Sequence, residues 1–141
     1  MSFTSIQKIR FDDVDGAGIV YYPQFFHLCH AAFEDFFDTA APISYPQMIK
    51  DRRLGFPTVS IESQFSASLV YGDIAIVELC VKRIGTSSVA FGYTIHRKHD
   101  GANCFNADVI TVFTNLDRQE SVPLDEEMRA ILSKHLSGAN A

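Results

Sequence analysis

A short acidic and glycine-rich segment near the N-terminus contains the residues best suited to chemistry. Asp13 and Asp15 are separated by one residue, and Gly16 and Gly18 follow them. A carboxylate can act as a nucleophile or a general base, and glycine lets the backbone approach a ligand closely. Pro23 then favours the first turn of a helix, whose unpaired N–H groups attract negative charge. A carboxylate beside a helix N-terminus supplies the minimum parts for acyl transfer, a base or nucleophile and a donor for the oxyanion.

Two ligand-binding loops and one purely structural role compete with that interpretation. As a calcium loop the segment lacks two ligands, because Ala17 and Gln24 occupy positions that need oxygen donors. As a dinucleotide fingerprint it lacks the third glycine, because Tyr21 stands there, and no βαβ unit follows. An acid-rich loop can also serve only to cap its own backbone, and composition alone favours that role.

The rest of the chain predicts one helix and a sheet that position this segment. Residues 3–11 alternate as a strand, and apolar residues at helical spacing predict a helix over 23–40 that is buried on most of its circumference. A closing helix over 125–136 has Asp125 as a candidate cap. Four further strands are expected in succession, at residues 59–69, 74–83, 87–97 and 105–115. The strand at 59–69 alternates and is expected to be half-buried. The predicted fold is α+β, an antiparallel sheet wrapped around one apolar helix.

Length and composition favour a single domain spanning residues 1–141. The chain is 47% hydrophobic and 21% charged, and no repeat or linker divides it. Its 12 basic and 17 acidic residues give a net charge of -5, so no nucleic-acid partner is expected. The longest apolar run, residues 17–23, is too short to span a membrane. The three cysteines are scattered without a CxxC pair, which favours free thiols and a cytoplasmic location.

The run from Phe11 to Phe25, FDDVDGAGIVYYPQF, resembles the signature of the hotdog-fold acyl-CoA thioesterases of the 4-hydroxybenzoyl-CoA thioesterase group. Residues 55–73 resemble the second strand and turn of that family, and residues 83–91 resemble its third hairpin. The resemblance covers essentially the whole chain and implies the hotdog fold.

The resemblance also implies roles for the acidic segment. Asp15 matches the catalytic carboxylate, acting as a nucleophile that gives a mixed anhydride or as a general base for water. The backbone N–H of Tyr22 matches the donor that polarises the thioester carbonyl. Gly16 and Gly18 allow close approach, and Phe25 is placed to line an acyl pocket. The substrate is then an acyl- or aroyl-CoA, with no cofactor apart from the CoA of the substrate, and Asp15 must face the helix N-terminus across a cleft.

The chain departs from the family pattern at two positions, and the resemblance also implies an oligomeric assembly. Many members carry His where this chain has Tyr22, so the chain is similar to the subgroup that acts on aryl-CoA esters. Gly16 replaces the Pro or Ala that often follows the catalytic Asp, which loosens the loop. Family members form homodimers or homotetramers with sites at the dimer interface, so Thr58, Val59 and Ser60 are expected to complete the pocket of the partner.

A basic strand-turn-strand region is a candidate for holding the CoA phosphates. It contains Lys82, Arg83, Ser87 and Ser88, which offer charge and hydroxyl donors. The alternative is an ordinary solvated hairpin tip, since exposed basic residues are common.

Residues on the central helix offer three further possibilities. His27 and His30 with Glu34 are short of a full metal shell, so ordinary hydrogen bonding is favoured and no metal is expected. Glu34 is nevertheless the fallback catalytic residue, because a second hotdog thioesterase group uses a carboxylate midway along this helix. Cys29 is interpreted as packing rather than a nucleophile.

The predicted function is therefore hydrolysis of a CoA thioester. The alternative is a hotdog protein that binds an acyl or aryl ligand without hydrolysing it. A hydratase of the same fold would need an Asp-His pair with a neighbouring Asn-Pro, which this chain lacks. The sequence leaves open which acyl group is bound and whether an acyl-carrier protein replaces CoA.

Overall fold

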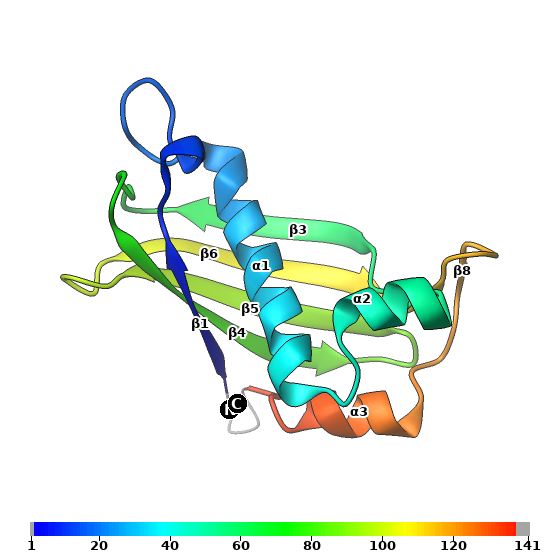
Figure 1. The fold of residues 1–141 in the computed structure, drawn as a ribbon. Coiled ribbons are helices and arrows are strands. Elements are labelled where there is room, and N and C mark those ends of the chain that lie inside the picture. Colours follow the sequence, from blue (N-terminus) through cyan, green and yellow to red (C-terminus); the bar gives the residue numbers. More distant parts are fainter. Residues whose placement is uncertain (1, 138–141) are drawn as a thin grey trace.

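A five-stranded antiparallel sheet with one long helix on one face organises the chain (Figure 1). The structure is a computed structural model, and it describes residues 2–137. The sheet has the order β1-β4-β5-β6-β3. Its strands are β1 (Phe3–Lys8), β3 (Thr58–Phe65), β4 (Ile74–Ile84), β5 (Ser88–Arg97) and β6 (Asn103–Val112). The predicted α+β architecture is confirmed.

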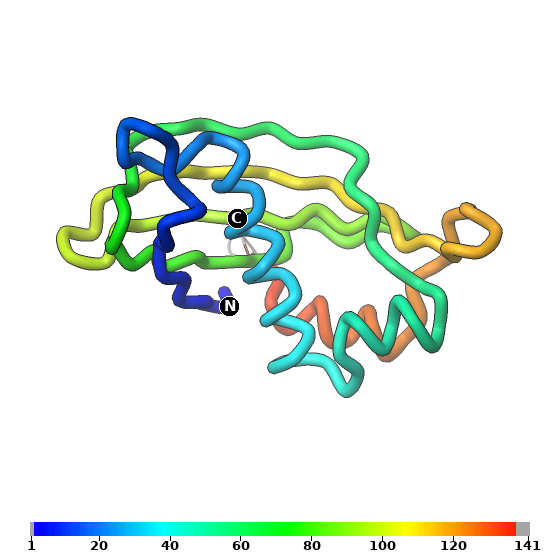
Figure 2. The backbone as a smooth tube through the Cα atoms, turned by 45° about the horizontal axis from the view of Figure 1, so that its top comes forward, coloured from blue at the N-terminus to red at the C-terminus, as the bar shows by residue number. Residues whose placement is uncertain are grey.

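Helix α1 (Tyr22–Ala40) crosses one face of the sheet and contributes seven buried side chains to the core (Figure 2). It starts with Pro23 in its first turn and ends before Pro42, so its bounds match the prediction to within one residue. Its buried side chains are Phe25, Leu28, Cys29, Ala32, Phe33, Phe36 and Phe37. Phe33 packs edge to face against Phe91 of β5, with ring centroids 5.3 Å apart, and Phe36 packs edge to face against Phe3 of β1 at 5.7 Å.

The position of β3 differs from what its sequence alternation suggests. β3 pairs with β6 and not with β4, its neighbour in sequence, so it forms one edge of the sheet. All eight residues of β3 are exposed, and the strand ends at Phe65 rather than at residue 69. The expectation of a half-buried strand is wrong because α1 packs mainly toward the other edge, against β1 and β4, and reaches β3 only at Phe65.

Shorter elements complete the fold. Residues 45–52 form α2 (Tyr45–Gln47) and a π-helical turn, Met48–Arg52. A small second sheet contains β2 (Leu54–Gly55), β7 (Thr114–Asn115) and β8 (Glu120–Ser121). The closing helix α3 (Glu126–Ser133) is shorter than expected, and its predicted cap is confirmed, since Asp125 Oδ1 accepts a 2.7 Å hydrogen bond from Met128 N–H.

Within residues 2–137, no helix combines the length and the apolar character that crossing a membrane requires.

Replacing Phe36 with Ala should destabilise the protein strongly. Phe36 is fully buried, and its ring lies 5.7 Å from that of Phe3 and 4.8 Å from that of His135. We expect the free energy of unfolding in urea to fall by about 3–5 kcal/mol. Phe11→Ala is the matched control, because Phe11 is 76% exposed, and it should change that free energy by less than about 1 kcal/mol. Equal losses in the two variants would contradict the assignment of the core.

Candidate active site

The acidic segment folds as a small hairpin that leads directly into α1. Val14 and Val20 form a bridge, and Asp15 N–H donates to Ile19 O at 2.9 Å. Gly18 N–H donates back to Asp15 O at 2.9 Å. Gly18 has φ of 81°, which an L-amino acid side chain rarely tolerates. The glycine therefore shapes the tight end of the hairpin.

The start of α1 presents an unpaired donor next to that hairpin. Tyr21 N–H donates to Asp13 O at 3.1 Å, and Gln24 N–H donates to Tyr21 O at 2.8 Å. Between them, Tyr22 N–H has no hydrogen bond to another residue of the described chain, and Pro23 has no N–H. The positive end of the helix dipole thus carries a free N–H at the predicted oxyanion position.

The carboxylate of Asp15 is exposed and folds back on its own loop. Its Oδ1 accepts a 2.8 Å hydrogen bond from Ala17 N–H, which is an Asx turn. Asp13 is the acid whose backbone carbonyl is bound to the residue before the helix, and its Oδ2 accepts from Arg10 N–H at 2.8 Å. One chain therefore provides the carboxylate and the donor but does not enclose a cleft around them.

An aromatic wall that sequence reasoning did not assign to the site stands beside the helix start. Phe65, the last residue of β3, is 50% exposed, and its ring lies 6.3 Å from that of Tyr22 and 5.5 Å from that of Phe25. Phe25 is itself buried and stacks on Phe105 at 5.1 Å. Phe65 lies on the same face of β3 as Ile61, which the alternation of the sequence could have indicated. Its position on an uncovered edge strand beside α1 could be known only from the fold.

The predicted partner-contacting residues lie on the exposed edge of the sheet. Thr58, Val59 and Ser60 open β3, and the register shifts there at a bulge. Val59 is 62% exposed and Ile61 is 46% exposed. An edge strand with exposed apolar side chains is a ready-made surface for pairing with another chain.

The predicted phosphate-binding residues lie at the other end of the sheet from the acidic hairpin. The hairpin adjoins the segment that leads into β4, since Tyr71 N–H donates to Gly18 O at 3.3 Å and Ile19 forms a bridge with Val70. Lys82 follows Ile74 by eight positions on β4, which corresponds to roughly 26 Å of strand. Lys82 Nζ is bound to Asp108 Oδ1 at 2.8 Å, and Arg83 lies opposite Ala90 after a bulge. A single chain does not bring Asp15 and these residues together.

The other candidates on α1 have ordinary partners. His30 Nε2 lies 2.8 Å from Glu34 Oε2, and the His30 ring stacks on Phe33. No cluster of three metal-ligating side chains occurs within residues 2–137. Burial raises the pKa of the Cys29 thiol to about 12, so this thiol stays protonated and unreactive.

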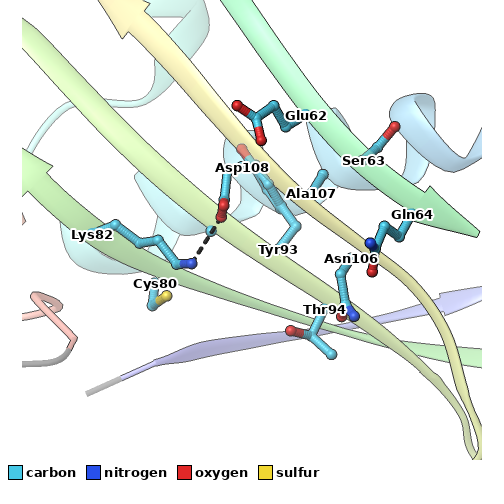
Figure 3. A pocket seen from close by; sticks show the side chains of 11 residues that line it. Glu62, Ser63, Gln64, Cys80, Lys82, Tyr93, Thr94, Asn106, Ala107 and Asp108 are labelled. Atoms are coloured by element: carbon cyan, nitrogen blue, oxygen red, sulfur yellow. Dashed lines mark ion pairs between the residues drawn. The ribbon is translucent and has the colours of Figure 1, made fainter. Parts of the chain in front are cut away.

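Two cavities lie elsewhere on the chain. The larger, about 600 Å³, is a hollow across β3, β4, β5 and β6 (Figure 3). The second, about 470 Å³, lies between β1 and α1 and is lined by residues that include Ser5 and Asp35. Neither cavity is lined by Asp15 or Tyr22.

Sequence comparison identifies the family of the chain. The profile of the thioesterase-like superfamily matches residues 9–132, which contain the acidic hairpin, α1 and strands β3 to β6. The 4-hydroxybenzoyl-CoA thioesterase of Pseudomonas sp. (strain CBS-3) is 30% identical over 132 residues, covering 88% of this chain and 94% of that protein. A 1,4-dihydroxy-2-naphthoyl-CoA hydrolase of Nostoc punctiforme is 30% identical over 95 residues, covering 67% of this chain and 64% of that protein.

Solved structures show the same architecture. A 4-hydroxybenzoyl-CoA thioesterase with an Asp-to-Asn substitution, complexed with 4-hydroxybenzoyl-CoA, matches with a TM-score of 0.84 and 27% identity, over 93% of this chain and 98% of that one. A 1,4-dihydroxy-2-naphthoyl-CoA thioesterase from Synechocystis matches with a TM-score of 0.85 and 24% identity, over 94% of this chain and 96% of that one.

The fold is thus the hotdog fold of thioesterases, as the sequence resemblance implied. The chain belongs to the thioesterase-like superfamily and is a thioester hydrolase by class.

Gly18→Ala should strain the acidic hairpin, whereas Gly16→Ala should not. A Cβ would meet no atom within 4 Å at either position, so the two differ in backbone conformation alone, and only Gly18 has positive φ. We expect Gly18→Ala to lower the free energy of unfolding by about 1–2 kcal/mol. Gly16→Ala should change it by less than about 1 kcal/mol. Urea denaturation of both variants measures the difference, and equal effects would contradict this hairpin geometry.

Proposed function

We propose that the chain hydrolyses an acyl- or aroyl-CoA thioester to the free acid and CoA, with Asp15 and Tyr22 as its catalytic groups. The observation that carries the proposal is the free N–H of Tyr22 at the positive end of α1, adjoining the hairpin that holds Asp15. Membership of a thioesterase superfamily supports a reaction site in this arrangement over a solvated turn.

The chemistry uses the two groups in complementary ways. The thioester carbonyl oxygen accepts a hydrogen bond from Tyr22 N–H, and the helix dipole stabilises the negative charge that develops on that oxygen. Asp15 then attacks the carbonyl carbon or removes a proton from an attacking water. The carbon–sulfur bond breaks, and CoA leaves as a thiolate that takes up a proton. In the nucleophilic route, water hydrolyses the resulting anhydride and restores the carboxylate.

Aroyl groups are the favoured acyl class. The named relatives act on 4-hydroxybenzoyl-CoA and 1,4-dihydroxy-2-naphthoyl-CoA. In this chain the half-exposed rings of Phe65 and Tyr22 stand at the helix start, where an aromatic acyl group can stack against them. Release of free thiol from a panel of aryl- and alkyl-CoA esters, with acyl-carrier-protein esters included, determines the substrate class.

Pairing of β3 with its own copy would complete the cleft. In a two-fold, antiparallel edge-to-edge pair, the Thr58 end of one β3 lies beside the Phe65 end of the other. Phe65 contacts Tyr22, so Thr58, Val59 and Ser60 of the second copy would form the missing wall near Asp15. The proposed active unit is therefore a homodimer with sites at its interface.

The same pairing brings the candidate phosphate-binding residues toward the site. Ser87 O accepts from Phe113 N–H, and Pro57 O accepts from Val112 N–H, so the β4–β5 turn and the start of β3 share one end of the sheet. Arg83, Ser87 and Ser88 of the second copy would then approach the CoA phosphates. Lys82 is held by Asp108, so it could contribute only after leaving that partner.

The proposed enzyme works in a reducing environment and without an added cofactor. All three cysteines are free, which supports a reducing, cytoplasmic location. Neither proposed step needs a cofactor beyond the CoA of the substrate. A non-catalytic binding protein is the disfavoured alternative, and it would leave CoA esters intact during the thiol-release assay.

Asp15→Asn should abolish hydrolysis while the fold persists. Asparagine keeps an oxygen that can accept from Ala17 N–H, but it supplies no nucleophile or base, so kcat/KM should fall by about 10²–10⁴-fold. Asp12→Asn is the matched control, since Asp12 is an exposed acid with no hydrogen bond in the described chain. Its thiol-release rate should stay within about twofold of the parent rate.

Glu34→Gln separates the fallback mechanism from the proposed one. Under the proposal this variant keeps most of its activity, because Glu34 lies midway along α1 and pairs with His30. Full activity of Asp15→Asn combined with an inactive Glu34→Gln variant would transfer the catalytic role to Glu34.

Ile61→Arg should separate the edge-to-edge dimer. Ile61 lies near the middle of β3 and meets its own copy in a two-fold pair, so two added charges would oppose each other. We expect the mass by light scattering to halve and thiol release to fall at the same chain concentration. Ala130→Arg, an exposed position on α3, should change neither. An Ile61→Arg variant of unchanged mass would rule out pairing through β3.

A further inference from the structure

The sheet has a second uncovered edge at β1, on the side opposite β3 (Figure 1). β1 pairs with β4, and within residues 2–137 none of its residues has a backbone hydrogen bond to another element. Ile74 O accepts from Lys98 N–H, so Ile74 directs its bonding groups toward β5 and not toward Lys8, its neighbour on β1. By alternation, the N–H and C=O groups of Thr4, Ile6 and Lys8 point away from the sheet. These groups can bind a further strand.

Helix α1 lies beside this edge and forms the second wall of a groove of about 470 Å³, which we name the β1–α1 groove. A groove between a strand edge and a helix can accept an extended peptide, because the edge supplies backbone hydrogen bonds and the helix supplies side-chain contacts. Ile6 is 65% exposed there. The residues that line the groove are Phe3, Thr4, Ser5 and Ile6 of β1 and Asp35, Asp38 and Thr39 of α1.

Both charged residues that line the β1–α1 groove are acids. Asp35 Oδ2 accepts hydrogen bonds from Ser5 Oγ at 2.7 Å and from Gln7 Nε2 at 3.1 Å, which hold the carboxylate beside β1. Asp38 lies three positions further along α1 and is exposed. Neither acid takes part in an ion pair in the described part of the chain. The groove therefore attracts positive charge.

The side chains of β1 alternate between two environments. Ser5 faces α1, since it binds Asp35, whereas Thr4 and Ile6 are exposed on the opposite side of the strand. A strand added to β1 would alternate in the same way. One set of its side chains would face Asp35 and Asp38, and the set between them would lie beside Thr4 and Ile6. The first position suits basic residues and the second suits apolar ones.

A second copy of the chain fits this edge poorly. Two copies paired through β1 would place Asp35 and Asp38 of both chains along one shared groove, and each chain carries a net charge of -5. Lys8 does not line the groove. Its charge lies further along the edge, and a lysine on an edge strand discourages indiscriminate strand pairing. The charge pattern favours a basic segment of another protein.

We propose that the β1–α1 groove binds an extended basic segment of another protein, which adds to β1 as a further strand of the sheet. The backbone groups of Thr4 and Ile6 supply the hydrogen bonds, and Asp35 and Asp38 select basic side chains. The groove lies at the opposite edge from β3, so its occupation does not compete with pairing through β3. The inference goes beyond the proposed hydrolysis and does not depend on the role of Asp15.

The probe is a fluorescein-labelled peptide of about seven alternating lysine and valine residues, the length of an ordinary strand. Fluorescence anisotropy in about 0.15 M salt measures its binding. We expect saturable binding to the parent protein. Asp35→Asn combined with Asp38→Asn should weaken that binding about tenfold, because two charge contacts are lost. The Asp35→Asn change keeps an oxygen that can accept from Ser5 Oγ, so β1 stays in place.

A matched control removes the same charge elsewhere. Asp12→Asn combined with Asp51→Asn neutralises two exposed acids that do not line the groove, and it should change the affinity by less than about twofold, since distant charges are screened. A peptide of alternating glutamate and valine should not bind the parent protein.

Methylation of the peptide backbone tests strand addition itself. Only alternate N–H groups of an added strand face β1, so N-methylation of one alternate set should abolish binding, and N-methylation of the other set should leave the affinity within about threefold. None of these measurements uses hydrolysis, so a failure of the proposed reaction would not alter their result.

A parent protein that does not bind the lysine–valine peptide at millimolar concentration would overturn the proposal. Equal affinities of the parent and the variant with both Asp35→Asn and Asp38→Asn would overturn it as well. Equal effects of the two methylation patterns would show that charge alone attracts the peptide, which would exclude strand addition. A parent whose mass by light scattering falls on Ile6→Arg would assign this edge to a second copy of the chain, against the proposal.

Discussion

The burial of one aromatic helix against the sheet is the constraint on which the rest of the structure depends. Seven of the nineteen residues of α1 are buried, and four of them are phenylalanines. Phe25, Phe33 and Phe36 pack on rings from the strands. This packing fixes the direction of the helix and hence the place of its positive end. The hydrogen bond from Tyr21 N–H to Asp13 O then ties the acidic hairpin to that end. The packing of the core therefore also positions the groups that create the proposed catalytic electrostatics.

The single chain leaves two surfaces of the sheet uncovered, and these surfaces differ in chemical character. The edge of β3 exposes backbone and apolar side chains such as Val59 and Ile61, which is a surface that a further strand can extend. The outer face of the sheet, opposite α1, instead carries a hollow of about 600 Å³ that contains the Lys82–Asp108 ion pair. Under the proposed function, the open side of the acidic hairpin and the bare edge of β3 have the same origin, because both lack the wall that a second chain would supply.

Much of this fold was predictable because its signals are local. The helix bounds follow from Pro23, apolar spacing and Pro42, and the cap of α3 follows from Asp125. The site was predictable only as a segment: the acidic, glycine-rich loop before α1 was predicted, but its hairpin pairing and the fold-back of the Asp15 carboxylate onto Ala17 N–H were not. The burial of β3 was predicted wrongly. An alternating sequence shows that the two faces of a strand differ in polarity, but it does not show whether another element covers either face.

The sequence by itself determined the main helices and strands, the acidic segment and the family resemblance, because propensity, periodicity and motif residues act within a few positions along the chain. Only the tertiary structure decided that β3 is an edge strand, that Phe65 joins Tyr22, and that Lys82 binds Asp108 across Gly92. These facts depend on which strands become neighbours. Strand order is set by the packing of the whole core around α1, and no local stretch of the chain encodes it.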